Sequence, residues 1–107
     1  MKNLGQMLKQ AQAMQSKMAE MNDRLAAAEV EGASGGGLVR ITLTGKGDMK
    51  RVAIDPKAVD PSDVAMLEDL LIVAYNDAKA KADTLTADEM QKVTGGLSLP
   101  GGMKLPF

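Results

Sequence analysis

The stretch VRITLTGKGDMKRVAID, residues 39–55, alternates apolar and polar residues on both sides of a glycine-containing loop. In its first half every second residue is apolar, and Val52 and Ile54 continue the alternation in the second half. Such alternation predicts two half-buried β-strands. The segment GKGD, residues 45–48, predicts the hairpin loop that joins them. The stretch therefore predicts an antiparallel hairpin with one apolar face.

A shorter strand is predicted immediately before this hairpin. Val30 and Gly32 suggest a strand, and SGGG at 34–37 is suited to the turn that follows it. Pro56 is expected to end the last strand, because proline cannot donate a backbone hydrogen bond to a sheet. The central part of the chain is thus predicted to be a small three-stranded antiparallel meander.

A long helix is predicted before the meander, over residues 3 to about 28, with a length of roughly 39 Å. It is too long to be covered by so small a domain, so its apolar side needs a partner. We considered two arrangements: the helix lies on its own sheet, or it pairs with other helices, partly within the chain and partly across a dimer. The apolar side is a heptad seam made of Leu4, Met7, Ala11, Met14, Met18, Met21, Leu25 and Ala28.

A second long helix is predicted after the meander, from Asp60 to about Ala82. Asp60 is the expected N-cap and Pro61 suits the first turn. Between residues 64 and 75 this helix is apolar on most sides, which predicts burial on most sides. One side can cover the sheet, and the other predicts a homodimer interface. The predicted interface residues are Leu67, Leu70, Leu71, Ile72, Val73, Ala74 and Tyr75.

The region from 84 to 94 has two interpretations. It either extends the second helix or forms a short separate helix, with Thr86 as N-cap and Glu89 at the capping-box position. The Gly- and Pro-rich segment 95–107 is predicted to be a tail. We therefore expect one dimerising domain, residues 1–94, followed by this tail.

Composition limits the possible functions. The chain has 107 residues, no cysteine, no histidine and only 2% aromatic residues. The missing residue types exclude disulfides, thiolate or imidazole metal sites and histidine acid–base chemistry. A core without large rings favours oligomerisation, which completes burial in small chains. We expect a non-enzymatic protein without a metal, a cofactor or a small-molecule substrate.

The chain also lacks the segments that direct proteins to membranes. The N-terminal MKNLGQ has no apolar signal-peptide region, and no run approaches 18 apolar residues. The protein is therefore expected in the cytoplasm. The glycine clusters 32–37 and 45–47 each lie between two predicted strands, where hairpin turns explain them better than phosphate-binding loops do.

Charge is distributed unevenly along the sequence. The net charge is −1, and residues 55–77 concentrate the acids, whereas residues 1–19 carry three lysines and no acid. Two interpretations of the basic residues on the first helix remain open: contacts to phosphates and an ordinary solvated face. These residues recur every 7 or 8 positions away from the seam, and they are Lys2, Lys9, Lys17 and Arg24.

In its order of blocks, the chain resembles the YbaB/EbfC family of bacterial nucleoid-associated proteins. The matching blocks are LKQAQAMQSKM (8–18), VEGASGGGLVRITLTGKG (30–47), RVAIDP (51–56), MLEDLLIVAYNDAKAK (66–81) and GGLSLPGGMKLPF (95–107). The resemblance implies an α+β fold of order α-β-β-β-α, assembled as an intertwined, tweezer-like homodimer with projecting helical arms. It also implies DNA binding, with Lys79 and Lys81 as additional candidates beside the four cations of the first helix.

The expected function is therefore that of a nucleoid-associated homodimer. It would bind double-stranded DNA mainly through the phosphate backbone, with low sequence specificity, because no recognition-helix motif or zinc finger is present. Such binding would organise the nucleoid or modulate transcription. The alternative is a protein-interaction or chaperone-like module, in which the Met-rich helical arms clasp a protein.

Overall fold

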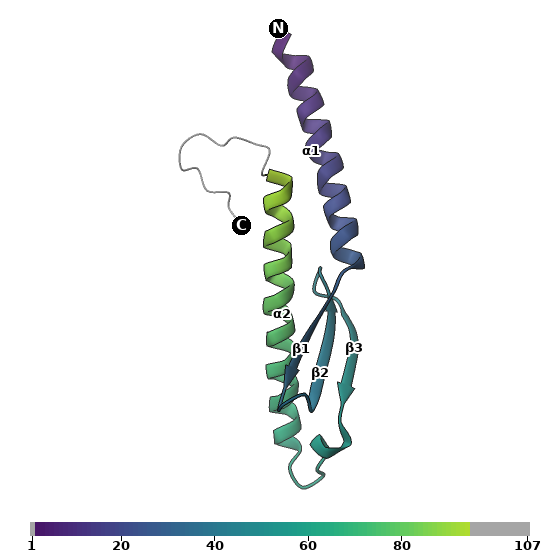
Figure 1. Ribbon diagram of the computed structural model, residues 1–107, viewed down its shortest axis with the longest axis vertical. Coiled ribbons are helices and arrows are strands. Elements are labelled where there is room, and N and C mark those ends of the chain that lie inside the picture. Colours follow the sequence, from purple (N-terminus) through teal and green to yellow (C-terminus); the bar gives the residue numbers. More distant parts are fainter. Residues whose placement is uncertain (1, 95–107) are drawn as a thin grey trace, which may run out of the picture.

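The computed structural model describes residues 2–94, so the predicted tail, 95–107, lies outside the described residues. The fold is the predicted α-β-β-β-α arrangement, with a three-stranded sheet and two long helices (Figure 1). The molecule is elongated, with dimensions of 73 × 27 × 16 Å. Its elements are α1 (Lys2–Ala27), β1 (Glu29–Ser34), β2 (Val39–Thr44), β3 (Met49–Ile54), the 3₁₀ turn η1 (Pro56–Ala58) and α2 (Val64–Thr94).

The sheet is an antiparallel meander of order β1-β2-β3. Strand β1 is longer than the predicted segment around Val30, because it pairs with β2 along all six of its residues. In β3, the register shifts so that Leu43 pairs with Met49, which leaves Lys50 as an extra residue in a bulge. The bulge keeps Met49 and Val52 on the same face as Leu43.

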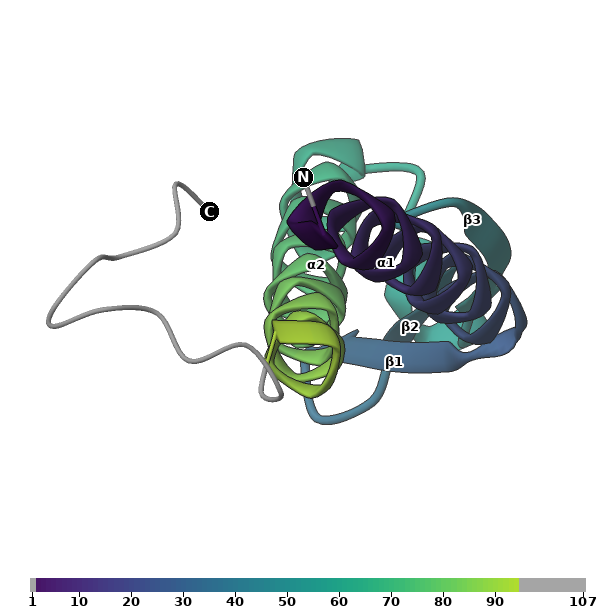
Figure 2. The ribbon, with the colours of Figure 1, turned by 90° about the horizontal axis from the view of Figure 1, so that it is seen from above.

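Helix α2 covers only part of that apolar face. It packs over β1 and β2, where Val39, Ile41 and Leu43 are almost fully buried together with Ala74 and Ala78. Strand β3 forms the other edge of the sheet, away from β1 and from the part that α2 covers (Figure 2). The helix therefore lies over β1 and β2, and the apolar face of β3 stays exposed.

The backbone of β1 comes very close to α2 at Gly32. A Cβ atom on this residue would lie 2.2 Å from both the Ala74 carbonyl oxygen and the Ala78 backbone nitrogen. Small residues on both elements therefore allow the helix to lie directly on the strand. Leu or Val at any of these three positions would force the two elements apart.

Two charged side chains of α2 bind the outer edge of β1. Asp77 accepts a hydrogen bond from the backbone N–H of Ala33 at 3.0 Å, and Lys81 donates one to the carbonyl of Glu31 at 2.8 Å. The bond from Ala33, helped by the charge of Lys81, holds the pKa of Asp77 below its ordinary value. Side chains thus satisfy an edge that would otherwise offer free backbone groups to another strand.

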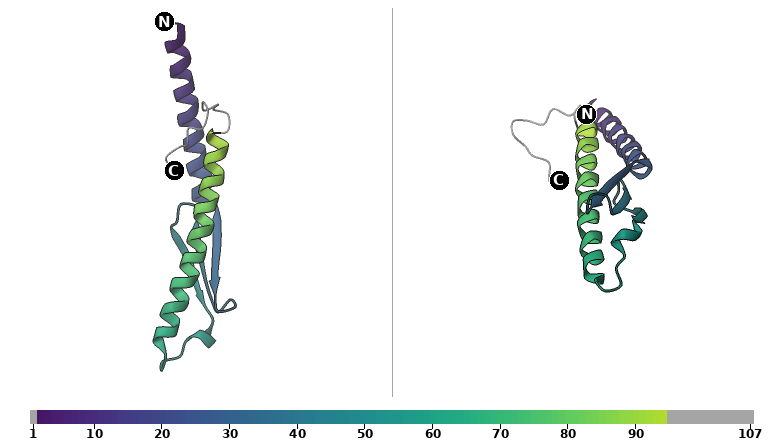
Figure 3. Two further views of the ribbon diagram at one scale, coloured as in Figure 1. Left: turned by 90° about the vertical axis from the view of Figure 1, so that its left-hand side faces the viewer. Right: turned by 60° about the horizontal axis from the view of Figure 1, so that its bottom comes forward.

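The N-terminal part of α1 projects beyond the rest of the molecule as an arm (Figures 1 and 3). Within residues 2–94, only the lower part of its heptad seam is covered: Met21 and Leu25 are buried with Val93 of α2, and Met14 and Met18 pack beside them. The seam therefore pairs with a helix of the same chain over this part, as one of the two predicted arrangements requires.

The ends of α2 differ from the sequence prediction. The helix begins at Val64, and its N-cap is Asp63, whose carboxylate accepts from the Met66 N–H at 3.2 Å. The prediction of Asp60 as N-cap was wrong, because Asp60 instead closes a local turn through two hydrogen bonds from Ser62.

At the other end, α2 runs without a break to Thr94, so residues 84–94 extend the helix. Thr86 is not a cap in this arrangement. Its hydroxyl donates to the Gly45 carbonyl at 3.2 Å, which ties the helix to the β2–β3 hairpin.

Changing Gly32 to Ala is expected to destabilise the protein by about 1–3 kcal/mol, because overpacking forces the backbones of β1 and α2 apart. The matched control is Gly5→Ala in α1, where an added Cβ meets nothing within 4 Å, and alanine should stabilise the helix by up to about 1 kcal/mol. Urea unfolding followed by circular dichroism measures both. Equal stability of the two variants would contradict the close packing.

A buried carboxylate joins the arm to α2. Arg24 contacts Glu89 at 2.9 Å, and Lys92 contacts the same carboxylate at 3.3 Å. Glu89 is almost fully buried, and the hydrogen bond from Arg24, followed by that from Lys92, lowers its pKa. Since an unfolded glutamate titrates near pH 4.3, this stabilisation should be complete above that pH and lost as the pH falls through the lower folded pKa.

Replacing Glu89 with Gln should therefore reduce the loss of stability between pH 7 and pH 3. Other carboxylates with lowered pKa values, among them Glu29 and Asp77, keep the remaining pH dependence. Urea midpoints measured at each pH for both proteins test this point. Parallel curves for the wild-type protein and the variant would show that Glu89 contributes nothing to the acid sensitivity.

Candidate nucleic-acid interface

The arm carries two exposed cations outside its apolar seam, one facing away from it and one beside it. Lys9 lies two residues after Met7, which is about 200° around the helix, and Lys17 borders the seam between Met14 and Met18. Both lysines are exposed, and no ion pair within residues 2–94 involves either of them. Lys2 is the first residue of α1. The arm therefore presents positive charge that the described part of the chain does not neutralise.

The other three predicted DNA-binding residues have partners within the chain. Arg24 holds Glu89, Lys79 contacts Asp83 at 3.3 Å, and Lys81 contacts Asp77 at 3.4 Å. Lys81 also binds the edge of β1. The structure thus assigns structural contacts to these cations and separates them from Lys9 and Lys17.

The cations of the sheet are also partly neutralised. Arg51 contacts Glu29 at 2.8 Å, and Lys50 approaches the same carboxylate at 3.8 Å. The hydrogen bond and the charge of Arg51 keep the pKa of Glu29 below its ordinary value. The outer face of the sheet is therefore a mixed surface, whereas residues 2–19 of the arm contain no acid.

An apolar groove lies between α2 and β3. It has a volume of about 350 Å³ and is lined by Ile41, Met49, Val52, Leu71, Ile72 and Tyr75. Ile72 is 58% exposed and Val52 is 44% exposed, although both are large aliphatic residues. At the groove, the apolar surface of the core continues past α2 onto the uncovered strand β3.

The seven predicted interface residues differ in how much surface they expose. Ile72 and Val73 are exposed, and Leu71 and Tyr75 are half-buried at the groove. Leu67 and Leu70 are half-buried against the core. Ala74, by contrast, is fully buried against β1 and has no surface left for a partner. Ala74 is therefore the least suited of the seven to contact a partner, and the interface itself stays a prediction.

Sequence reasoning missed the contribution of β3 to this apolar surface. Met49, Val52 and Ile54 share one face of the strand and are all exposed. A signal was present: the strand alternates as a half-buried strand does, yet a single helix is too narrow to cover three strands, since helices pack about 10 Å apart and strands about 4.8 Å. The outermost strand was bound to remain uncovered.

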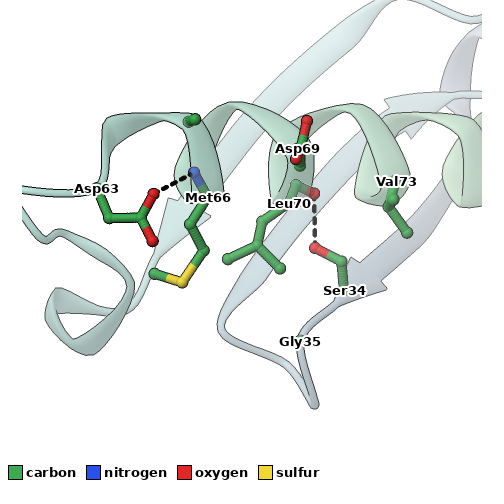
Figure 4. Close-up of a pocket in the computed structure, with 8 residues that line it drawn as sticks. Ser34, Gly35, Asp63, Met66, Asp69, Leu70 and Val73 are labelled. Atoms are coloured by element: carbon green, nitrogen blue, oxygen red, sulfur yellow. Dashed lines mark hydrogen bonds between the residues drawn. The ribbon is translucent and has the colours of Figure 1, made fainter.

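A second hollow, of about 420 Å³, lies at the start of α2, between this helix and the turn after β1 (Figure 4). Its polar groups are used locally: the Ser34 hydroxyl donates to the Leu70 carbonyl at 2.6 Å, and Asp63 caps the helix. Asp63 and Asp69 make the rim acidic. This end of the molecule would repel a phosphate.

Other kinds of site are not found in the described part of the chain. Residues 2–94 contain no group of three or more carboxylates, histidines or cysteines that could hold a metal ion. No helix within those residues has the length and apolarity to cross a membrane. The clusters Gly35–Gly37 and Gly45–Gly47 lie in the two hairpin turns, as predicted.

Comparisons with known proteins agree with this geometry. The model of the YbaB/EbfC DNA-binding family matches residues 1–97. A nucleoid-associated protein from Paramagnetospirillum magneticum is 62% identical over 107 residues, and one from Granulibacter bethesdensis is 59% identical over 107 residues, each match covering 100% of both chains. In the crystal structure of an uncharacterized protein, HP0035 from Helicobacter pylori, the same fold occurs with a TM-score of 0.73 and 20% identity, over 89% of this chain and 97% of that chain.

These relatives confirm the family that the sequence blocks predicted, and the family is one of DNA-binding proteins and not of enzymes. The chain belongs to the YbaB/EbfC DNA-binding family.

Proposed function

We propose that the protein is a nucleoid-associated homodimer that binds double-stranded DNA through the phosphate backbone, with low sequence specificity, in the bacterial cytoplasm. It organises the nucleoid or modulates transcription. One observation carries the proposal: the arm presents Lys9 and Lys17, exposed and without ion pairs in the described chain, on a helix that projects away from the acidic part of the molecule.

The acids at the start of α2 and in the loop before it are too far from the arm to cancel its charge. The start of α2 and the loop before it carry Asp55, Asp60, Asp63, Glu68 and Asp69 at the end opposite the arm. Val93 packs beside Met21 and Leu25, and Asp69 lies 24 residues earlier on the same helix, roughly 36 Å away. The Debye length at 0.1 M salt is about 10 Å, so these five acids contribute little to the field at the arm.

The apolar groove supports the proposed dimer. Each large aliphatic side chain that a second copy buries contributes about 1.5–3 kcal/mol relative to exposure. Ile72 and Val52 supply such side chains at the groove. The edge of β1 is closed by Asp77 and Lys81, so a second copy would meet the open β3 side. A dimer doubles the number of arms and therefore the number of phosphates that can be contacted.

The contacts proposed for the arm are not suited to reading bases. Lysine is a flexible point charge, whereas base-specific contacts usually need bidentate side chains such as Arg, Asn or Gln placed in the major groove. The glutamines of α1, residues 6, 10, 12 and 15, add donors that can reach phosphate oxygens. Binding should therefore depend on salt much more than on sequence.

One observation favours a second function, a protein-interaction module. The arm exposes Leu4, Met7 and Leu8, at 58%, 62% and 59%, and flexible methionine suits irregular protein surfaces. Affinity for a protein would not show the steep salt dependence of phosphate binding. Salt dependence of the affinity for DNA therefore separates the two functions.

Reversing both charges, Lys9→Glu with Lys17→Glu, should weaken binding to random and defined duplexes alike by at least about tenfold at 100 mM salt. The slope of log K against log salt should become shallower by about 0.9 for each phosphate that the variant no longer neutralises. Fluorescence anisotropy of a labelled duplex at 50, 100 and 200 mM salt gives both quantities.

The control for this experiment is Arg40→Glu with Lys57→Glu. It makes the same change in charge with two exposed residues at the end of the sheet far from the arm. The control should keep its salt slope. Equal losses of affinity in both double variants would indicate an effect of overall charge and would eliminate the arm as the binding surface.

Changing Ile72 to Asp should dissociate the dimer, because burial of an unpaired carboxylate in an apolar interface is strongly unfavourable. Leu4→Asp is the matched control, since Leu4 is exposed to the same fraction, 58%, but lies on the arm. Sedimentation equilibrium should show a monomer, or a concentration-dependent loss of folding, for the first variant alone. Unchanged dimerisation in the Ile72 variant would remove the groove from the interface.

A further inference from the structure

The upper part of the α1 seam has no cover within residues 2–94. Below it, Met14 and Met18 pack against a cluster that includes Val93, the second-last residue of α2. Above it, Leu4 and Met7 of the seam and the neighbouring Leu8 are each about 60% exposed. The cover stops because α2 ends at Thr94, while α1 continues for roughly three more turns, about 18 Å. The uncovered seam thus starts where the chain leaves α2.

The segment after α2 is rich in apolar residues that could cover this part of α1. Residues 95–107 read GGLSLPGGMKLPF, with two glycines that can end the helix and let the chain turn. Apolar residues then alternate in two short runs, LSL and MKLPF, separated by PGG. Alternation places apolar side chains on one side of an extended chain. Lys104 is the only charged residue of the segment.

We propose that residues 95–107 dock on the uncovered seam of the same chain, with apolar side chains of the segment against Leu4, Met7 and Leu8. The segment replaces α2 as the cover of α1 beyond Thr94. The docked segment leaves Lys9 free, because Lys9 faces away from Met7. The inference concerns the apolar side of the arm and does not depend on DNA binding.

The length of the segment 95–107 favours docking on the α1 seam over docking in the apolar groove between α2 and β3. Thirteen residues span at most about 43 Å when extended, and the uncovered seam needs less than half of that length. Ile72 lies 22 residues before Thr94, roughly 33 Å along α2, so the groove could be reached only by a nearly straight segment. A short tether to the seam also gives an effective concentration in the millimolar range, at which weak apolar contacts suffice.

Disulfide trapping in the full-length protein tests the docking. The chain has no cysteine, so Met7→Cys with Met103→Cys introduces a single pair. Under a mild thiol oxidant this pair should form an intrachain disulfide at least about tenfold faster than the control pair Lys9→Cys with Met103→Cys, whose first cysteine is on the opposite side of α1. Non-reducing electrophoresis with mass spectrometry identifies the bond. Sedimentation and DNA anisotropy of the same variants report separately on the proposed function.

Three results would overturn the proposal. Equal rates for the two pairs would show that the segment does not select the seam. A faster bond with Ile72→Cys and Met103→Cys would assign the segment to the groove. In a mixture of Met7→Cys chains and Met103→Cys chains, efficient cross-linking between chains would show that the segment covers the partner's arm. Addition of Leu105→Asp to the Met7→Cys, Met103→Cys protein should slow trapping if apolar contact drives docking.

Discussion

The direct contact between Gly32 of β1 and the backbone of α2 is the constraint on which the rest of the structure depends. Because no Cβ separates them, α2 lies over the first two strands and is held at the outer edge of β1 by Asp77 and Lys81. A single helix in that position cannot also cover β3. The same contact that closes one side of the sheet therefore leaves the other side apolar and open.

The distribution of charge follows from the same arrangement. The loop before α2 and the first turns of this helix carry five acids at one end of the molecule. Toward the other end, Lys9 and Lys17 of α1 have no ion pair within residues 2–94. Where the two helices meet, Glu89 neutralises Arg24 and is itself buried. Arg24, Lys79 and Lys81 are engaged in structural ion pairs, whereas Lys9 and Lys17 remain available to a ligand.

Much of the architecture could be predicted from the sequence, because it depends on local patterns. Period-two alternation gives the hairpin, and the heptad seam gives a long helix that needs a partner. The predicted boundary at Asp60 failed because two acids, Asp60 and Asp63, both suit a turn or a cap, and only the path of the chain distinguishes them.

The site was less predictable, because it depends on tertiary contacts. Seven apolar residues of α2 predict an interface, but periodicity cannot show that Ala74 faces β1 while Ile72 faces outward. In the same way, the sequence alone cannot rank the six cations predicted to bind DNA. Ion pairs between distant segments, such as Arg24 with Glu89, separate the engaged cations from the exposed ones.

The connection between α1 and β1 has a mechanical consequence. A single residue, Ala28, separates the two elements, and its N–H continues the hydrogen bonding of the helix to the Arg24 carbonyl at 2.9 Å. Helix α1 is thus joined to the sheet through a short and hydrogen-bonded connection. Since α1 is roughly 39 Å long, a tilt of a few degrees at its base displaces the tip by several ångströms. The twist of the small sheet and the packing of α1 on α2 therefore together set the distance between the arms in any symmetric pair.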